Sequence, residues 1–196
     1  QIRFVNESGK QVVLSPEMKE CVEGKRGSDI LQSGMCGKDI SFTLTYDGVL
    51  TLSGTGASDN FHSQKFPEWV ANKGLIKEII VEEGVTGLGN MIFRDCMSVE
   101  KISLPESLLS IGGYAFAGCV GLEEFAFPKN IQTIGANILS GTVLSRVTYD
   151  GYDEDWDWVE VGSGNDNWLD KLEVARVGLR VRLAERDASY VYTGSA

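Results

Sequence analysis

A 23-residue repeat constrains the fold of this chain more than any other feature of its sequence. Three successive segments align, beginning at Ile76, Val99 and Leu122: IKEIIVEEGVTGLGNMIFRDCMS, VEKISLPESLLSIGGYAFAGCVG and LEEFAFPKNIQTIGANILSGTV. A fourth copy begins at Leu144 as LSRVTYDG and then diverges. A unit of this size cannot bury its own apolar side, so the units must stack and share one continuous core.

The order of apolar residues within each unit predicts how the unit folds. Its first part reads apolar-x-x-apolar-x-apolar, as at Ile76, Ile79 and Val81, which indicates a short strand with alternate side chains pointing inward. Pro105 and Pro128 follow the second and third strands, where proline ends the hydrogen-bond ladder. A recurring glycine suggests a tight bend at positions 89, 112 and 135. The predicted fold is a β-dominated repeat solenoid with a curved parallel sheet.

The repeat motif also resembles that of a known family. The pattern Ile-Gly-x-x-Ala-Phe-x-x-Cys, complete from Ile111 to Cys119, is similar to the BspA-type leucine-rich repeats of bacterial surface proteins. Residues 33–56 resemble the N-terminal cap that often precedes such repeats. Residues 147–169 resemble the closing unit that often follows them, with Trp156 in its usual place. The resemblance implies a mixed α/β leucine-rich-repeat solenoid.

The sequence on either side of the repeats suggests caps, which a short solenoid needs to cover its apolar ends. Apolar residues alternate around Asp47-Gly48 and predict a hairpin. Short helices are expected at 67–74 and 153–159, and further strand patterns predict a hairpin within 1–32 and strands at 179–183 and 189–193. We divide the chain into an N-terminal flanking element (1–32), a hairpin-and-helix cap (33–74), the repeats (75–146), an acidic closing unit (147–175) and terminal strands or the start of a further module (176–196).

Charge is concentrated at one end of the chain. The 18 basic and 28 acidic residues give −10, and eight of the acids lie within residues 147–170, which contain no base. This balance excludes a generally basic nucleic-acid binder. No apolar run approaches the roughly 18 residues that span a bilayer. We therefore expect no nucleic-acid partner, no membrane insertion and a monomer. Because the chain begins with glutamine, we also expect that a leader or an upstream portion has been removed.

The outward-facing positions of the predicted strands form a first candidate binding surface. Opposite charges on neighbouring strands stabilise a sheet by roughly 0.2–1 kcal/mol per pair, so the structural interpretation is a self-neutralising ladder. The functional alternative is a groove on the concave face that binds a polypeptide better than a highly charged ligand. The signs alternate from strand to strand, with small or apolar neighbours: Glu78, Lys101, Glu124 and Arg146, beside Ile80, Ser103, Ala126 and Thr148.

The acidic closing unit is a second candidate, because it holds three of the four tryptophans. Trp156 is expected in the core, whereas Trp158 and Trp168 depart from the usual closing unit and are predicted to be exposed contacts. The alternatives are a solvated acidic cap, a protein or glycan contact, and a calcium site. The acidic residues from Asp150 onward do not match the spacing of a calcium-binding loop, so no metal is assigned.

Cysteine and histidine offer no convincing catalytic arrangement. Cys96 and Cys119 occupy equivalent places one repeat apart and are expected to stack in the core as buried thiols. Cys21 and Cys36 could pair, which the sequence leaves open. His62 is the only histidine and lies in a polar loop without an identifiable nucleophile. We expect no catalytic residue and no cofactor.

These features favour a non-catalytic binding module, secreted or on the cell surface of a bacterium. The family resemblance implies host association and adhesion to an extracellular protein or glycan. A different interpretation is a targeting or spacer region of a larger secreted enzyme, and a weaker one is a hydrolase that uses two acids of the closing unit. The full-length reading frame would discriminate between the first two.

Overall fold

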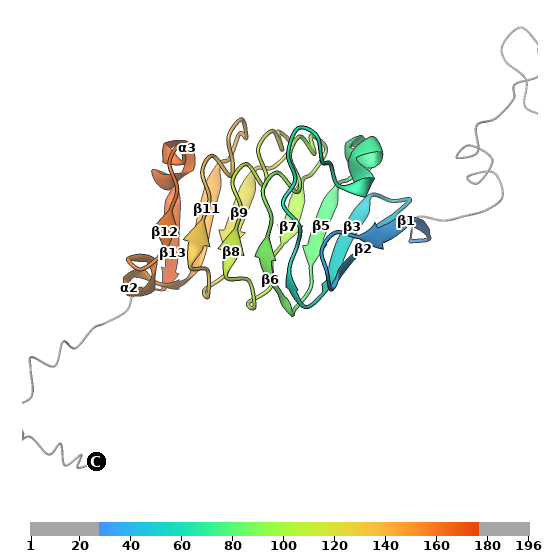
Figure 1. Ribbon diagram of the computed structural model, residues 1–196. Helices are drawn as coiled ribbons and strands as arrows, with labels where there is room; N and C mark the ends of the chain where they lie inside the picture. Colours follow the sequence, from blue (N-terminus) through green and yellow to red (C-terminus); the bar gives the residue numbers. More distant parts are fainter. Residues whose placement is uncertain (1–27, 177–196) are drawn as a thin grey trace, which may run out of the picture.

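Successive turns of the chain stack along one axis and form an elongated solenoid (Figure 1). The structure is a computed structural model that describes residues 28–176. It confirms the predicted repeat solenoid of parallel strands. The hairpin expected ahead of residue 28 and the strands expected at 179–183 and 189–193 lie outside the described residues.

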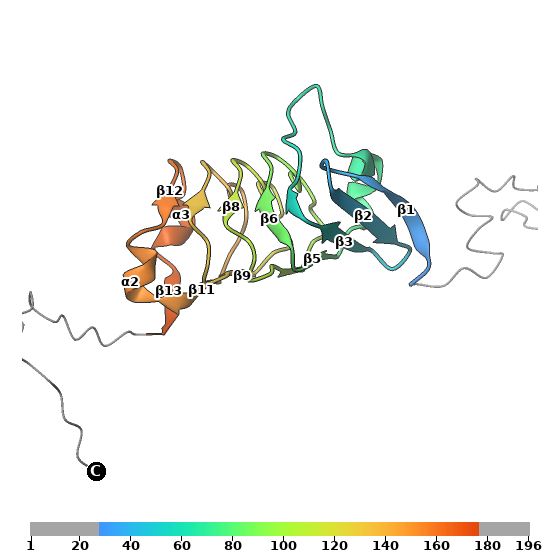
Figure 2. The same cartoon turned by 60° about the horizontal axis from the view of Figure 1, so that its bottom comes forward.

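The strands form two long faces that the chain visits in turn (Figures 1 and 2). One face begins with a five-stranded sheet, whose members in spatial order are β1 (Ile30–Met35), β2 (Ile40–Thr45), β3 (Val49–Gly54), β5 (Glu78–Val81) and β7 (Lys101–Ser103). It continues beside β7 with a three-stranded sheet, β9 (Glu124–Phe127), β11 (Arg146–Tyr152) and β13 (Leu172–Arg176). The other face is a single sheet of β4 (Gly56–Ala57), β6 (Val85–Leu88), β8 (Ser110–Ile111), β10 (Thr133–Ile134) and β12 (Glu160–Val161).

Pairing between neighbouring repeats follows the register of the sequence alignment. Ile79 of β5 lies opposite Ile102 of β7, and Phe125 of β9 opposite Val147 of β11, all in parallel strands. Equivalent residues therefore stack on one another, as the period of 23 predicts. No ladder is formed between β7 and β9 within the described residues, so the strand face is interrupted there.

In the N-terminal cap, a hairpin leads into the first turn of the solenoid. Strands β2 and β3 pair antiparallel around the Asp47-Gly48 turn, and β3 then pairs in parallel with β5. The expected helix is the 3-10 helix η1 (Glu68–Leu75), which buries Trp69 against Phe42 with ring centroids 4.8 Å apart. Strand β1 adds an antiparallel strand that the sequence pattern did not predict.

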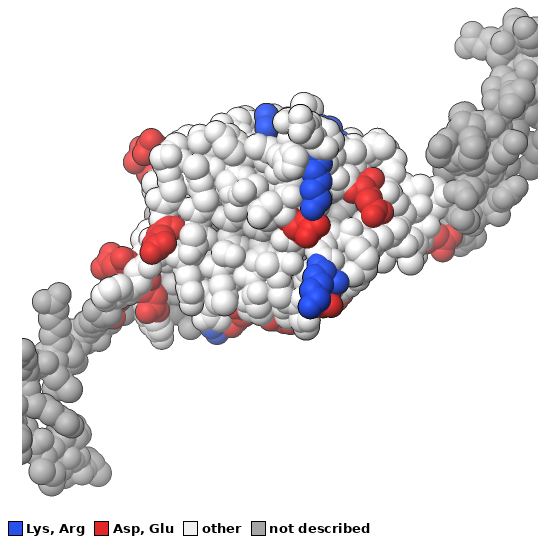
Figure 3. Space-filling view, in the orientation of Figure 1, with Lys and Arg blue, Asp and Glu red and all other residues white. Residues whose placement is uncertain are grey.

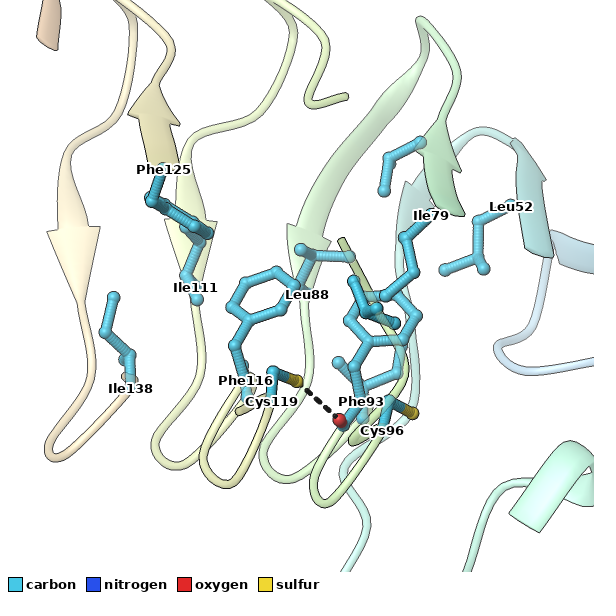
Figure 4. Close-up of a cluster of buried hydrophobic side chains, with 14 of the residues drawn as sticks. Leu52, Ile79, Leu88, Phe93, Cys96, Ile111, Phe116, Cys119, Phe125 and Ile138 are labelled. Carbon is cyan, nitrogen blue, oxygen red and sulfur yellow. Dashed lines mark hydrogen bonds between the residues drawn. The ribbon is translucent and has the colours of Figure 1, made fainter. Parts of the chain in front are cut away.

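An aromatic stack runs through the centre of the core and joins the cap to the repeats. The ring centroids of Trp69 and Phe93 are 6.0 Å apart, and those of Phe93 and Phe116 are 5.3 Å apart. Figure 4 shows Phe93 and Phe116 beside the two thiols of the repeats, where the Cys119 thiol donates to the Phe93 carbonyl oxygen at 3.3 Å. Cys96 and Cys119 are buried, as predicted.

The recurring glycines allow neighbouring turns to approach closely. A Cβ on Gly112 would lie 2.5 Å from the Asn90 backbone nitrogen, and one on Gly135 would lie 2.3 Å from the Gly113 nitrogen. The predicted tight bend is therefore not the main requirement at these positions. Left-handed backbone recurs elsewhere in the repeat, at Asp95 and, one period on, at Gly118.

The closing unit contains two short helices, whereas the sequence predicted one. Helix α2 (Asp153–Trp156) ends three residues before the predicted end at 159. Helix α3 (Asp166–Leu169), which the sequence pattern did not predict, follows β12. The chain then returns through β13, which pairs in parallel with β11. The core is thereby closed by aromatic side chains of the acidic segment.

Candidate functional site

The outward positions of β5, β7, β9 and β11 form one surface, as their spacing predicted. Glu78 lies opposite Lys101 and Arg146 lies opposite Glu124 in the strand register. Beside them, two further pairs follow the same register: Ile80 with Ser103, and Thr148 with Ala126. All eight are at least partly exposed, whereas three of the four residues between them, Ile79, Phe125 and Val147, are buried.

Three of the four charged residues of this surface form ion pairs, and the pairs differ partly from the expected ladder. Lys101 Nζ lies 2.6 Å from Glu78 Oε1, as alternation predicted. Arg146 Nε instead lies 3.0 Å from Oε2 of Glu173 on β13. Sequence reasoning missed Glu173, although the alternation of Leu172 and Val174 could have indicated the strand. Exposed pairs of this kind contribute up to about 1 kcal/mol each.

A groove of about 600 Å³ lies where β7 and β9 fail to pair. Its walls include Lys101, Glu124, Ala126, Arg146 and Thr148, five of the residues predicted to face outward. Its floor includes Ile102, which is half-buried, whereas the equivalent Ile79 and Phe125 are buried. The interrupted ladder thus gives this face a hollow that an uninterrupted sheet would lack.

Trp158 lies at the edge of a second groove, at the closing end of the solenoid. It is 78% exposed, and Tyr152 in the same groove is 46% exposed. The groove has a volume of about 410 Å³ and combines these aromatic rings with amides and carboxylates, among them Asn130, Gln132 and Asp155. An exposed indole beside fixed hydrogen-bonding groups suits a ligand that has both an apolar face and polar atoms.

A hydrogen bond connects two of the segments that line this second groove. The Tyr149 hydroxyl donates to the Lys129 carbonyl oxygen at 2.8 Å, which ties β11 to the turn that follows β9. Burial, together with the negative charge of Asp155, raises the pKa of Tyr149 above its ordinary value. The phenol therefore remains a hydrogen-bond donor throughout the neutral pH range.

The prediction that Trp168 is an exposed contact is wrong. The side chain is fully buried, and its ring centroid lies 5.0 Å from that of Phe127. Its indole Nε1 donates to Oδ1 of Asn165 at 3.1 Å. Helix α3 turns the ring inward, so Trp168 seals the core and only Trp158 stays exposed. The half-buried Trp156 packs against the core, as expected.

Asn165 is a structural residue that sequence reasoning missed. Its Oδ1 also accepts from the Ile138 backbone N–H at 3.1 Å, and its Nδ2 donates to the carbonyl oxygens of Gly135 at 2.9 Å and Gly162 at 2.7 Å. The pattern Asn-Asp-Asn-Trp-Leu could have indicated it, since an asparagine before a short apolar turn is typical of a helix start.

The acidic side chains of the closing unit do not converge on one point. Figure 3 shows separate acidic groups around this end of the described chain rather than a single cluster. Within residues 28–176 no group of three or more histidine, cysteine or acidic side chains could hold a metal ion. No helix in the same range is both long and apolar enough to cross a membrane.

The remaining reactive side chains are placed as follows. His62 is exposed, and its Nδ1 accepts from the Gln64 backbone N–H at 3.3 Å. Cys36 is buried, and desolvation raises its pKa to about 12. Cys21 lies outside the described residues, so the question of its pairing with Cys36 stays open.

The fold and its stacked repeats define the class of this protein, a leucine-rich-repeat solenoid. Residues 70–153 match the family model of the BspA type leucine rich repeat region (6 copies). These residues therefore are a BspA-type leucine-rich repeat region, as the motif at Ile111 to Cys119 indicated. A comparison with curated proteins finds no match.

The comparison with solved structures finds bacterial proteins, several of them named as leucine-rich repeat proteins. A leucine-rich repeat protein from Eubacterium ventriosum is 23% identical with a TM-score of 0.57, and the match covers 74% of this chain and 44% of that one. A leucine rich repeat protein of T. pallidum is 23% identical with a TM-score of 0.44, and the match covers 65% of this chain and 63% of that one. The pneumococcal vaccine antigen PcpA is 29% identical with a TM-score of 0.41, and the match covers 57% of this chain and 31% of that one. The first comparison shows the fold, and this chain spans less than half of that protein.

Proposed function

We propose that this chain is a non-catalytic binding module of a secreted or cell-surface bacterial protein, and that it recognises an extracellular protein or glycan. The BspA-type repeats support a scaffold role, because a solenoid of stacked repeats presents an extended surface on a rigid core. The proposal includes the surface location, the adhesion role and the absence of catalysis.

The exposure of Trp158 is the observation that carries the proposal. A large indole that is 78% exposed gains little from folding, whereas full burial of such a ring in a partner would gain roughly 2 kcal/mol or more. Tryptophan and tyrosine are the residues that most often dominate binding energy. Trp158 and Tyr152 share one groove with polar side chains that can fix the orientation of a ligand.

The groove between β7 and β9 is the second contact surface of this proposal. Lys101 and Arg146 each already have a carboxylate partner, whereas Glu100, Glu123 and Glu124 also line this groove, so its uncompensated charge is negative. The partly exposed Ile102 lies at the floor between them. An extended polypeptide therefore suits this surface better than a highly charged anionic ligand does.

The experiment is a binding screen of the purified chain against a panel of immobilised extracellular matrix proteins and glycans. We expect binding to at least one member, and loss of about tenfold or more in affinity for Trp158→Ala. The matched control is Val143→Ala, because Val143 is also exposed (73%) but lies outside both grooves. Equal binding by wild type and Trp158→Ala, or no binding across a broad panel, would contradict the proposal.

A further inference from the structure

We propose that the N-terminal end of the solenoid carries a second, independent binding site, which takes one large apolar side chain flanked by carboxylates in an acidic partner segment. The site is a pocket of about 270 Å³ between the loop at residues 58–67, η1 and the first repeat. The loop, drawn in teal, stands out from the solenoid in Figure 2. Trp158 lies at the opposite end of the molecule.

The base of the pocket is apolar and rigid. Trp69, Ile92 and Cys96 line it, and each is only 1% exposed. The indole of Trp69 is fixed between Phe42 and Phe93, with ring centroids at 4.8 and 6.0 Å. A site whose floor belongs to the core is formed before the ligand arrives, so little ordering cost opposes binding.

The walls add apolar area that is still open to solvent. Val70 and Met91, which are half-buried, line the pocket together with the buried Pro67. Phe66 lies on the lip and is 57% exposed. A pocket of this size is smaller than the roughly 300–1,000 Å³ that hold drug-sized ligands. It therefore fits a single large side chain rather than an extended molecule.

The rim gives the pocket a positive charge on an otherwise acidic protein. Lys73 Nζ lies 3.5 Å and Arg94 Nε 3.9 Å from the same carboxylate oxygen, Oδ2 of Asp95. Two cations share one anion, so one positive charge remains uncompensated at the mouth. The nearby Lys65 is already paired with Asp59 at 2.8 Å and adds nothing to this excess. The acidic closing unit lies at the far end of the solenoid and does not cancel it.

An apolar base and a cationic rim together specify the ligand. The base favours an aromatic or long aliphatic side chain, and the rim favours carboxylates on the residues next to it in sequence. A purely apolar ligand would leave Lys73 and Arg94 unused, and a small inorganic anion would leave the base unfilled. The combination is provided by an acidic peptide segment with one aromatic residue at its centre.

The experiment measures fluorescence anisotropy of a fluorescein-labelled peptide, Gly-Asp-Glu-Phe-Glu-Asp-Gly, titrated with the chain. We expect saturable one-to-one binding that weakens as salt is raised. Replacing the phenylalanine of the peptide with alanine is expected to weaken binding about tenfold or more, because the pocket would be left unfilled.

Variants of the protein locate the binding site. Val70→Trp fills the pocket without changing charge, and Lys73→Gln removes one rim cation; both are expected to weaken binding about tenfold. Lys38→Gln removes the same charge from an exposed side chain that does not line the pocket, and it should retain wild-type affinity. The urea unfolding midpoint of each variant is measured and compared with that of wild type, so that a misfolded variant is recognised.

The inference is overturned if the phenylalanine and alanine peptides bind alike, or if Val70→Trp and Lys73→Gln bind as tightly as wild type. Trp158→Ala should leave peptide binding unchanged. A loss of peptide binding in Trp158→Ala would place the peptide in the groove at the closing end and would also contradict the inference. The function proposed for Trp158 therefore does not depend on this second site, and the two experiments test the two proposals separately.

Discussion

Asn165 is the side chain whose removal should cost the closing unit most. It is 1% exposed and makes four hydrogen bonds, of which three join α3 to the last two solenoid turns and one, from Trp168, lies within α3. Asn165→Ala would leave buried donors and carbonyls unpaired, at about 1 kcal/mol each. We expect the free energy of unfolding in urea to fall by about 3 kcal/mol.

The neighbouring Asn167 provides the control for this measurement. Asn167 is exposed, and its Nδ2 makes a single bond to the Leu139 carbonyl oxygen at 3.1 Å. Asn167→Ala is expected to lower the free energy of unfolding by less than about 1 kcal/mol. Equal losses in the two variants would show that Asn165 does not hold the cap.

Residue-scale prediction from the sequence succeeded where the repeat fixed a position. Cys96 and Cys119 repeat with the period of the fold, so their burial followed from the alignment. Trp158 and Trp168 lie where the repeat has ended, and only the four-residue helix α3 decides which of them faces inward. A helix that short has no hydrophobic periodicity to detect, so the sequence could not separate them.

At the scale of elements, each repeat has two left-handed positions, and Gly118 occupies the second of them in the middle repeat. Gly118 has φ +78, and an added Cβ would lie 2.5 Å from Oδ1 of Asp95 in the preceding repeat. Gly118→Ala is expected to lower the free energy of unfolding by about 1–2 kcal/mol, because alanine is strained in this backbone region. Chemical denaturation with circular dichroism detection measures it.

Gly74 is the matched control for this glycine substitution. A Cβ at Gly74 would meet no atom within 4 Å, and its backbone is outside the left-handed region. Gly74→Ala should therefore change the free energy of unfolding by no more than about 0.5 kcal/mol. If Gly118→Ala were as harmless, the turn could not require a left-handed residue.

The elements that the sequence pattern predicted well are those fixed by turn chemistry or by the period. The Asp47-Gly48 turn signal predicted the hairpin, and the alignment of the repeats predicted the register of β5, β7, β9 and β11. The interruption between β7 and β9 could not be predicted, because both strands carry the ordinary repeat pattern. It depends on small displacements between turns, and these decide whether a ladder forms.

At the scale of the whole molecule, the three buried thiols within residues 28–176 make stability sensitive to high pH. Burial raises the pKa of Cys36 and of Cys96 from 9.0 to about 12, and raises that of Cys119 as well. The unfolded chain then releases thiol protons above pH 9 while the folded chain keeps them. The contribution of these thiols to the free energy of unfolding should therefore be constant below about pH 8 and fall between pH 9 and 10, by up to about 1.4 kcal/mol per pH unit for each thiol.

Removing one thiol tests this sign. With reductant present, Cys119→Ala should begin from a lower free energy of unfolding but fall less steeply between pH 9 and 10 than wild type. Other titrating groups are common to both proteins and cancel in the difference. Parallel pH profiles would show that the Cys119 thiol does not contribute.

The central claim, that Trp158 is the contact of a binding module, is tested most directly by acrylamide quenching of tryptophan fluorescence. All four tryptophans lie in the described chain; Trp69 and Trp168 are buried and Trp156 is half-buried, so Trp158 should supply most of the quenchable emission. Saturation with a partner from the binding screen is predicted to reduce quenching to the level of the unliganded Trp158→Phe variant. A partner that binds while quenching stays unchanged would contradict the account.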